Sequence, residues 1–191
     1  ANEYERREVI KKLSVQHDLS GIPGFYRKYG EWKMYEPPYG GYFVPVCNKD
    51  GYIQGMQIRL DVDDDRYRWF STNEYPEGTG VSSWVHVVGD TSSDTAYLTE
   101  GALKADVTST LSGGELFIAI PGVNAVTCLA DTLRRLKLKK VYEAYDVFAA
   151  TNEWPRDYIY YGLTPQQPKG PFNRDFKESL VYFKSVSYTH L

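Results

Sequence analysis

The hydrophobic and polar positions at the start of the chain predict a helix followed by a connector. Residues 3–17 are charged and helix-prone, and Val9, Ile10 and Leu13 fall on one face, as a short amphipathic helix requires. Residues 19–32, LSGIPGFYRKYGEW, are rich in glycine and aromatic side chains. We expect this second stretch to be a connector made of turns.

Several β-prone runs follow the connector. Residues 42–46 (YFVPV) and 52–60 (YIQGMQIRL) flank a short polar segment that contains Asp50-Gly51, a strong signal for a tight turn. This arrangement predicts a β-hairpin. Two further strand-like runs come after it, YRWFS at 67–71 and WVHVV at 84–88. The first half of the chain is therefore expected to be β-rich and antiparallel.

From residue 95 the pattern changes to alternating strands and helices. Short apolar runs predict three strands, at residues 96–99, 116–120 and 140–145. Residues 102–111, which a Gly-Gly pair follows, and residues 124–137, which carry a leucine stripe, predict two helices. Strands and helices that alternate with short joints are typical of a parallel sheet with crossover helices.

The predicted fold class is α/β, α+β overall, with a β-rich N-terminal subdomain followed by a parallel α/β core. The expected parts are a helical lead-in (1–17), the β-rich subdomain (18–90), the α/β core (91–152), an unassigned or truncated tail (153–185) and a terminal scar (186–191). The chain starts at Ala1 rather than Met, and residues 186–191 look like one reading frame of a transposon end used to tag DNA libraries. We interpret the chain as a fragment; an ordinary polar tail is the alternative.

Composition and charge narrow the class of protein. Of 191 residues, 42% are hydrophobic and the formal net charge is −3, which excludes a disordered chain. No apolar run approaches the roughly 20 residues of a membrane helix. No basic segment precedes an apolar one, so we expect a cytoplasmic protein with no membrane partner. Cys47 and Cys128 lack metal-ligand spacing and fit reduced thiols. With so little net charge, any contact with nucleic acid must be local.

Two carboxylates follow predicted strands of the α/β core. Glu100 comes directly after the first strand, and Asp146 directly after the third. The intervening strand ends in a segment that contains Gly122, which lets a ligand approach the backbone closely. Carboxylates that meet at one sheet edge suit Mg²⁺, which prefers oxygen ligands. The alternative is that these acidic residues cap a helix or face water, as most residues at strand ends do.

The motifs of the α/β core resemble a Toprim domain, the metal-binding module of topoisomerases and bacterial primases. These motifs are LTEGALKAD, IAIPGVNAV and VYEAYD, in that order. Upstream, YFVPVCNKDGYIQGMQIRL followed by Arg66-Tyr67 resembles the β-rich block that precedes the Toprim domain in DnaG-type primases. The order of motifs is most similar to divergent Toprim-like proteins of unknown function from phages, plasmids and conjugative elements. The resemblance covers roughly residues 18–152.

The resemblance implies a metal site with two departures from the family pattern. By position, Glu100 matches the glutamate that acts as metal ligand or general base, and Asp146 matches the first residue of an Asp-x-Asp pair that binds Mg²⁺. The second residue of that pair is Phe148 here, and Lys104 stands where primases carry an acidic residue. Asp106, two residues further on, would project from another helix face. The resemblance therefore implies a one-metal or catalytically weak site.

Other polar residues have two interpretations each. Lys104, one helical turn beyond Glu100, could form an ion pair with it or clamp a phosphate as a catalytic residue. Arg59 could face solvent or, as the resemblance implies, face the nucleotide or template groove. Arg68 is also predicted to bind nucleic acid or phosphate. The list of predicted phosphate-binding residues is completed by Gly122 and Asn124. His86 stands inside an apolar strand, and we expect it to be packed rather than catalytic.

The resemblance implies a mobile-element DNA replication protein related to primases. Its expected chemistry is Mg²⁺-dependent nucleotidyl or phosphoryl transfer, and its expected partners are DNA or RNA, nucleotides, and further domains or a helicase of the same replication system. The alternative is a non-catalytic nucleic-acid-binding module within a larger primase-helicase, which Phe148 favours.

Overall fold

The computed structural model describes residues 3–62, 66–122 and 127–144. In these ranges the chain forms helices, antiparallel sheets and one mixed, largely parallel sheet, which confirms the predicted fold class. The chain divides into two compact units: unit 1 (Ala1–Pro45 and Gly55–Ser82) and unit 2 (Val46–Gln54 and Ser83–Leu191). The turn of the predicted hairpin and the adjoining strand ends (Val46–Gln54) therefore belong to unit 2, and the rest of its two strands belongs to unit 1.

Unit 1 begins with α1 (Glu3–Gln16), the helix that the amphipathic pattern predicts. The next segment differs from the prediction, because β1 (Phe25–Lys28) and β2 (Glu31–Met34) pair as an antiparallel hairpin instead of forming a connector of turns. Tyr29 and Gly30, with φ of 55° and 78°, make the two-residue turn between them. The many turn residues of this stretch hide two strands of only four residues each.

A three-stranded sheet follows, in the order β3 (Gly41–Cys47), β4 (Ile53–Leu60) and β5 (Tyr67–Trp69). The predicted tight turn between β3 and β4 is confirmed: Gly51 N donates to Asn48 O at 3.0 Å, and Gly51 has a φ of 80°. β5 pairs antiparallel with β4. The β-rich character of the first half is thus confirmed, including the strand-like run that becomes β5.

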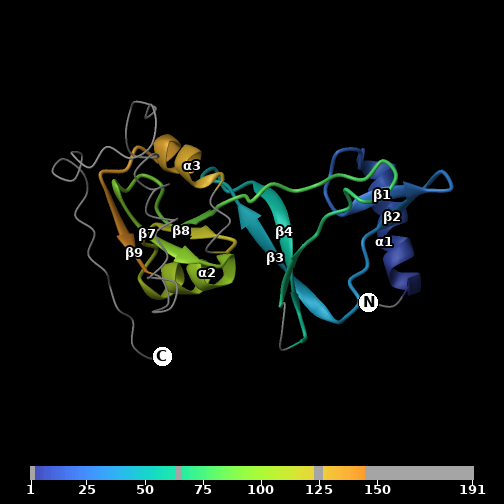
Figure 1. The fold of residues 1–191 in the computed structure, drawn as a ribbon, viewed down its shortest axis with the longest axis horizontal. Helices are drawn as coiled ribbons and strands as arrows, with labels where there is room; N and C mark the ends of the chain where they lie inside the picture. Colours follow the sequence, from blue (N-terminus) through green and yellow to red (C-terminus); the bar gives the residue numbers. More distant parts are fainter. Residues whose placement is uncertain (1–2, 63–65, 123–126, 145–191) are drawn as a thin grey trace, which may run out of the picture. The chain divides into compact units, whose positions relative to one another are not determined.

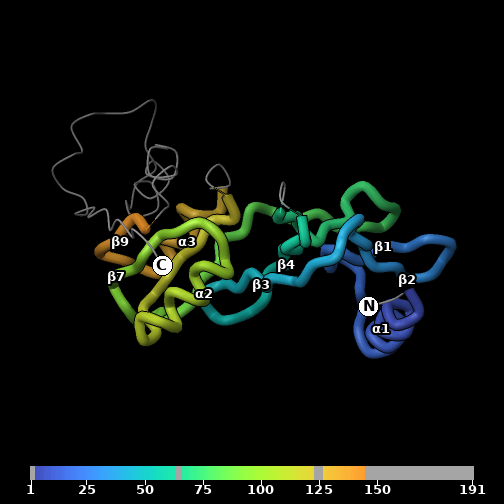
Figure 2. The backbone as a smooth tube through the Cα atoms, turned by 90° about the horizontal axis from the view of Figure 1, so that it is seen from below, coloured from blue at the N-terminus to red at the C-terminus, as the bar shows by residue number. Residues whose placement is uncertain are grey.

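Unit 2 is built on a four-stranded sheet. The strand order is β6 (His86–Val88), β8 (Phe117–Ile120), β7 (Thr95–Glu100) and β9 (Lys140–Glu143). β7 runs parallel to both of its neighbours, so the first strand of the α/β pattern is the middle one of the three parallel strands. β6 lies antiparallel to β8. β7 and β9 lie side by side in both views (Figure 1, Figure 2).

Two helices cover opposite faces of this sheet, α2 (Ala102–Leu111) and α3 (Leu129–Leu136) (Figure 1). Successive side chains of a strand point to opposite faces. Accordingly Ile118 packs with the leucines of α3, whereas Phe117 and Ala119 pack against α2. The crossover arrangement that the sequence predicts is therefore present.

The observed bounds agree with the predicted ones for α2 and differ for α3. α2 has the predicted bounds, and its end is tied to the next strand because the buried Ser109 hydroxyl donates to Glu115 O at 2.8 Å. α3 begins at Leu129, later than the predicted 124, and residues 123–126 lie outside the described residues. Among the described residues no helix is long and apolar enough to span a bilayer.

Candidate functional site

The candidate site lies at the edge of the unit 2 sheet where β7, β8 and β9 end. Because β7 is parallel to both neighbours, the carboxyl ends of the three strands meet there. Two backbone bonds join the strand ends: Gly101 N donates to Ile120 O at 2.9 Å, and Ala144 N donates to Leu98 O at 2.7 Å. Glu100, the last residue of β7, is half-buried at the middle of this edge.

Gly101 turns the chain from β7 into α2. Its φ of 84° lies in the left-handed region, which glycine adopts without strain. A Cβ at this position would meet no atom within 4 Å, so conformation rather than space requires glycine. As the N-cap residue, Gly101 has no side chain that could cap the first N–H groups of α2. These donors and the helix dipole favour an anion next to Glu100.

A second carboxylate, which sequence reasoning did not single out, lies on the neighbouring strand. Glu143 is the last residue of β9 and is only 4% exposed. It stands opposite Leu98 in the register. Because residues two apart in a strand share a face, Glu143 and Glu100 lie on the same face of adjacent strands. The signal in the sequence is an acidic residue inside the apolar run KVYEAY.

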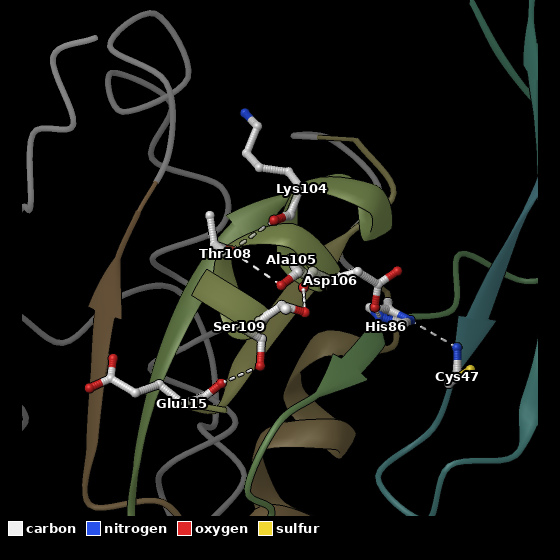
Figure 3. A network of polar contacts seen from close by, with 9 residues as sticks. Cys47, His86, Lys104, Ala105, Asp106, Thr108, Ser109 and Glu115 are labelled. Carbon is white, nitrogen blue, oxygen red and sulfur yellow. Dashed lines mark hydrogen bonds and ion pairs between the residues drawn. The ribbon is translucent and has the colours of Figure 1, made fainter. Parts of the chain in front are cut away.

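Lys104 lies one turn into α2 and is half-buried. The Lys104 carbonyl accepts a hydrogen bond from Thr108 Oγ1 at 2.7 Å, and the Lys104 side chain extends away from the side of α2 that carries Asp106 (Figure 3). Both interpretations of Lys104, an ion pair with Glu100 and a phosphate contact, stay predictions.

Asp106 faces His86 instead of the strand ends (Figure 3). His86 Nε2 lies 2.9 Å from Asp106 Oδ1, and His86 Nδ1 lies 3.0 Å from the Cys47 amide nitrogen. Because an amide N–H can only donate, Nδ1 is the acceptor and the proton is assigned to Nε2, which donates to Asp106. His86 is 3% exposed, which confirms that it is packed. Asp106 therefore does not replace the acidic residue missing at Lys104.

The thiol of Cys47 sits beside this His86–Asp106 pair. Burial raises the pKa of the Cys47 thiol, and the nearby charge of Asp106 raises it further. A thiol with a raised pKa is mostly protonated near neutral pH and is a poor nucleophile. The Cys47 thiol is therefore expected to react slowly with electrophiles near neutral pH.

Arg59 and Arg68 belong to unit 1 and are described apart from the strand-end site. The Arg59 guanidinium lies 5.8 Å from the centre of the Tyr67 ring and donates to the carbonyl of Leu60. Arg68 is exposed on β5, opposite Ile58 of β4. The predicted binding residues thus fall into two groups, one in each unit.

The remaining predicted residues divide by whether the structure describes them. Gly122 follows β8 by two residues, and a Cβ there would meet no atom within 4 Å. This open space agrees with a glycine that a ligand can approach. Asn124, Asp146 and Phe148 lie outside the described residues.

The donor set at the strand ends suits an ion with few protein ligands. Within the described ranges, no three His, Cys, Asp or Glu side chains come together to hold a metal. Glu100 and Glu143 supply two carboxylates on one face of adjacent strands. In phosphate-handling sites Mg²⁺ usually keeps several waters and takes only one or two carboxylates. The described residues therefore fit Mg²⁺.

Among known proteins, the chain is similar to solved structures only. No family model and no curated protein matches the chain. Among solved structures, the chain is similar to the zinc-binding and RNA polymerase domains of the Aquifex aeolicus primase, with a TM-score of 0.55 and 16% identity over 85% of this chain and 41% of that chain.

Two further solved structures are similar at lower scores. They are the DnaG primase catalytic domain bound to ssDNA (TM-score 0.45, 15% identity, 84% of this chain and 45% of that chain) and the DnaG catalytic core (TM-score 0.44, 13% identity, 84% and 48%). The chain spans less than half the length of each of the three proteins. The likeness to the Aquifex aeolicus primase shows that this chain shares the fold of the matched part of that structure.

Proposed function

We propose that this chain is the core of a primase-related replication protein of a mobile genetic element, which carries out Mg²⁺-dependent nucleotidyl or phosphoryl transfer on nucleic acid. One observation carries the proposal: Glu100 ends the middle one of three parallel strands, in a fold similar to that of a primase. Ligands of such sheets bind beyond the carboxyl ends of the strands.

The proposed roles follow from what each residue can offer. Glu100 and Asp146 would hold Mg²⁺, and Glu143 lies on the same face of the sheet as Glu100. The bound ion would supply positive charge to a phosphate in the transition state. The free N–H groups at the start of α2 and the ammonium group of Lys104 would orient phosphate oxygens beside Glu100.

The open backbone at Gly122 and the side chain of Asn124 would complete the phosphate contacts in unit 2. In unit 1, Arg59 and Arg68 would bind the nucleic acid strand, since both carry a guanidinium group on the β4–β5 pair. DNA or RNA and nucleotides are the proposed partners, together with a helicase or further domains of the same replication system.

A Mg²⁺ titration of the chain tests the metal role directly. We expect saturable Mg²⁺ binding by calorimetry that Glu100→Gln weakens at least about tenfold, because a charged oxygen ligand is lost. Glu115→Gln is the matched control, since Glu115 is exposed and begins the segment before β8, away from the strand ends. Equal binding in both variants would remove Glu100 from the metal site.

The second candidate function is a non-catalytic module that grips nucleic acid inside a larger primase-helicase. Phe148, at the position where the Toprim pattern has its second aspartate, favours this candidate. It predicts single-strand binding that is unchanged by Mg²⁺ and by Glu100→Gln. If the unsubstituted chain binds DNA but does not bind Mg²⁺, the protein is the non-catalytic module and not the enzyme.

A further inference from the structure

A small cavity lies in unit 2 on the face of the sheet that α3 covers. Its volume is about 50 Å³. Its apolar floor is formed by Val85 and Val87, which belong to the same hydrophobic cluster as the leucines of α3. The polar walls come from the turn between β3 and β4, from Gln54 at the start of β4, and from Thr132 and Arg135 of α3. Glu100 and Gly122 do not line this cavity, so it is separate from the strand-end site.

Two side-chain amides in the wall have orientations that the backbone fixes. Asn48 Oδ1 accepts hydrogen bonds from the backbone N–H of Asp50 at 2.9 Å and of Tyr52 at 3.0 Å. The Asn48 amide nitrogen therefore keeps both of its N–H donors. Gln54 Nε2 donates to Val85 O at 3.1 Å, which leaves one N–H on that nitrogen. Both amides line the cavity, so its wall is rich in hydrogen-bond donors.

The charged residues of the wall come from opposite sides. Lys49 in the turn and Arg135 on α3 both line the cavity. Lys49 Nζ pairs with Asp50 Oδ1 at 2.6 Å, and Asp50 is the only acidic lining residue. Arg135 forms no hydrogen bond or ion pair with a described residue. With two positive charges and one negative charge, the lining has a net charge of +1.

We propose that this cavity is a phosphate-binding site that takes a single phosphate group, from a nucleotide or from a nucleic acid strand. A buried water needs about 10–15 Å³ of such volume, so the cavity has room for about three or four waters or one ion of phosphate size. The guanidinium of Arg135 matches the geometry of phosphate oxygens, and Lys49 adds a point charge while it neutralises Asp50. The proposal goes beyond the proposed function, because it requires neither Glu100 nor Mg²⁺.

Titration with inorganic phosphate in the absence of Mg²⁺, followed by backbone amide NMR shifts, tests the site. We expect saturable shifts in the β3–β4 turn and at the end of α3. Arg135→Gln should weaken phosphate binding about tenfold, since a charge-assisted contact is lost. Arg134→Gln is the matched control, because Arg134 is the neighbouring arginine, does not line the cavity and pairs with Asp131 at 2.7 Å. Asp50→Asn should tighten binding, because it removes the only negative charge of the lining.

The same variants then distinguish the source of the phosphate. If the site serves a strand, Arg135→Gln should lower the slope of log affinity against log salt for single-stranded oligothymidylate by about one. If it serves a nucleotide, Arg135→Gln should weaken ATP binding and leave oligothymidylate binding unchanged. Absence of saturable shifts, or equal phosphate binding in Arg134→Gln and Arg135→Gln, would overturn the proposal. Because no Mg²⁺ is present, neither result depends on the proposed enzymatic function.

Discussion

The two units of the chain build their cores in different ways. Unit 2 packs aliphatic side chains from four strands and α3 into one cluster, so each residue contributes a part of the burial. Unit 1 gathers aromatic rings around Phe70, which is 1% exposed. Phe43, Phe25 and Tyr35 approach the Phe70 ring edge-on, with ring centres 5.0, 5.7 and 6.5 Å away. A shared aliphatic core tolerates the loss of one member better than a core that depends on a single ring.

The largest expected effect comes from removing that ring. Phe70→Ala should lower the free energy of unfolding by about 4 kcal/mol, because it deletes a buried ring and leaves a cavity. Leu98→Ala in unit 2, also fully buried, should cost about 3 kcal/mol. Denaturant unfolding with hydrogen exchange would measure both effects and locate them by unit. A larger loss in Leu98→Ala would contradict the comparison of the cores.

The next largest loss of stability is expected when glycines with a positive φ are replaced by alanine. At Gly89, with a φ of 98°, a Cβ would lie 2.1 Å from the backbone oxygen of Glu115, which cannot turn away. At Gly24, with a φ of 90°, the Cβ would meet the ring of Phe70 at 1.9 Å, and a ring can shift. Gly51 has a φ of 80° and open space around it, which makes it the control for strain alone.

We expect Gly89→Ala to cost about 3 kcal/mol and Gly51→Ala about 1 kcal/mol, with Gly24→Ala between them. Thermal unfolding of the three variants measures the order. A Gly51→Ala variant as unstable as Gly89→Ala would mean that backbone strain, and not the close approach to Glu115, sets the cost.

A smaller effect should appear in thiol reactivity within unit 2. Burial raises the pKa of the Cys47 thiol, and the charge of Asp106 raises it further. Asp106→Asn keeps an oxygen for His86 and removes the charge, so it should lower the Cys47 pKa and raise its alkylation rate at pH 8 by about two- to threefold.

Cys128 is the internal reference for that experiment. Burial raises its pKa too, and its charged neighbour is Asp131 rather than Asp106. Peptide mapping after iodoacetamide treatment would follow both thiols in one sample. If Cys128 accelerates as much as Cys47, the variant has loosened the unit rather than changed the charge beside Cys47.

The smallest expected effect concerns the exposed ion pair between Asp94 and Lys139, whose charged atoms are 2.9 Å apart. The hydrogen bond from Lys139 lowers the pKa of Asp94, and the same bond raises the pKa of Lys139. The stability from Asp94 is therefore present above its unfolded pKa of about 3.9 and is lost as the pH falls through its lower folded value.

The stability that Lys139 contributes depends on pH in the opposite direction. It is present below the unfolded pKa of about 10.4 and is lost as the pH rises through the higher folded value. Because both groups are exposed, Asp94→Asn should change urea midpoints only slightly at neutral pH and should flatten their decline below about pH 4. An unchanged acid decline would mean that this pair does not contribute to stability.

How far the sequence predicts the structure depends on how local each signal is. The bounds of α2 agree with the prediction because its stop signal, the Gly113-Gly114 pair, lies in the chain directly after the helix. The place of β7 in the middle of the three parallel strands could not be predicted, because strand order depends on pairing between distant segments. The β1–β2 hairpin was missed because Tyr29, rather than a usual turn residue, adopts a positive φ there.

The same limit applies to the candidate site. Sequence motifs led to Glu100, and the structure places it at the end of the middle one of three parallel strands. They did not lead to Glu143, which becomes a candidate only because the register of β9 sets it on the same face as Glu100. Nor could they show that Asp106 is engaged by His86, since the two lie 20 residues apart in the sequence.

The most direct test of the central claim is template-dependent primer synthesis by the complete gene product, with Glu100→Gln compared with the control Glu115→Gln. We predict that Glu100→Gln lowers the rate of synthesis about a hundredfold or more at saturating Mg²⁺, because a group beside the reacting phosphate is lost. Glu115→Gln should keep the unsubstituted rate. Equal rates in the two variants would contradict the assignment of Glu100 to the reaction.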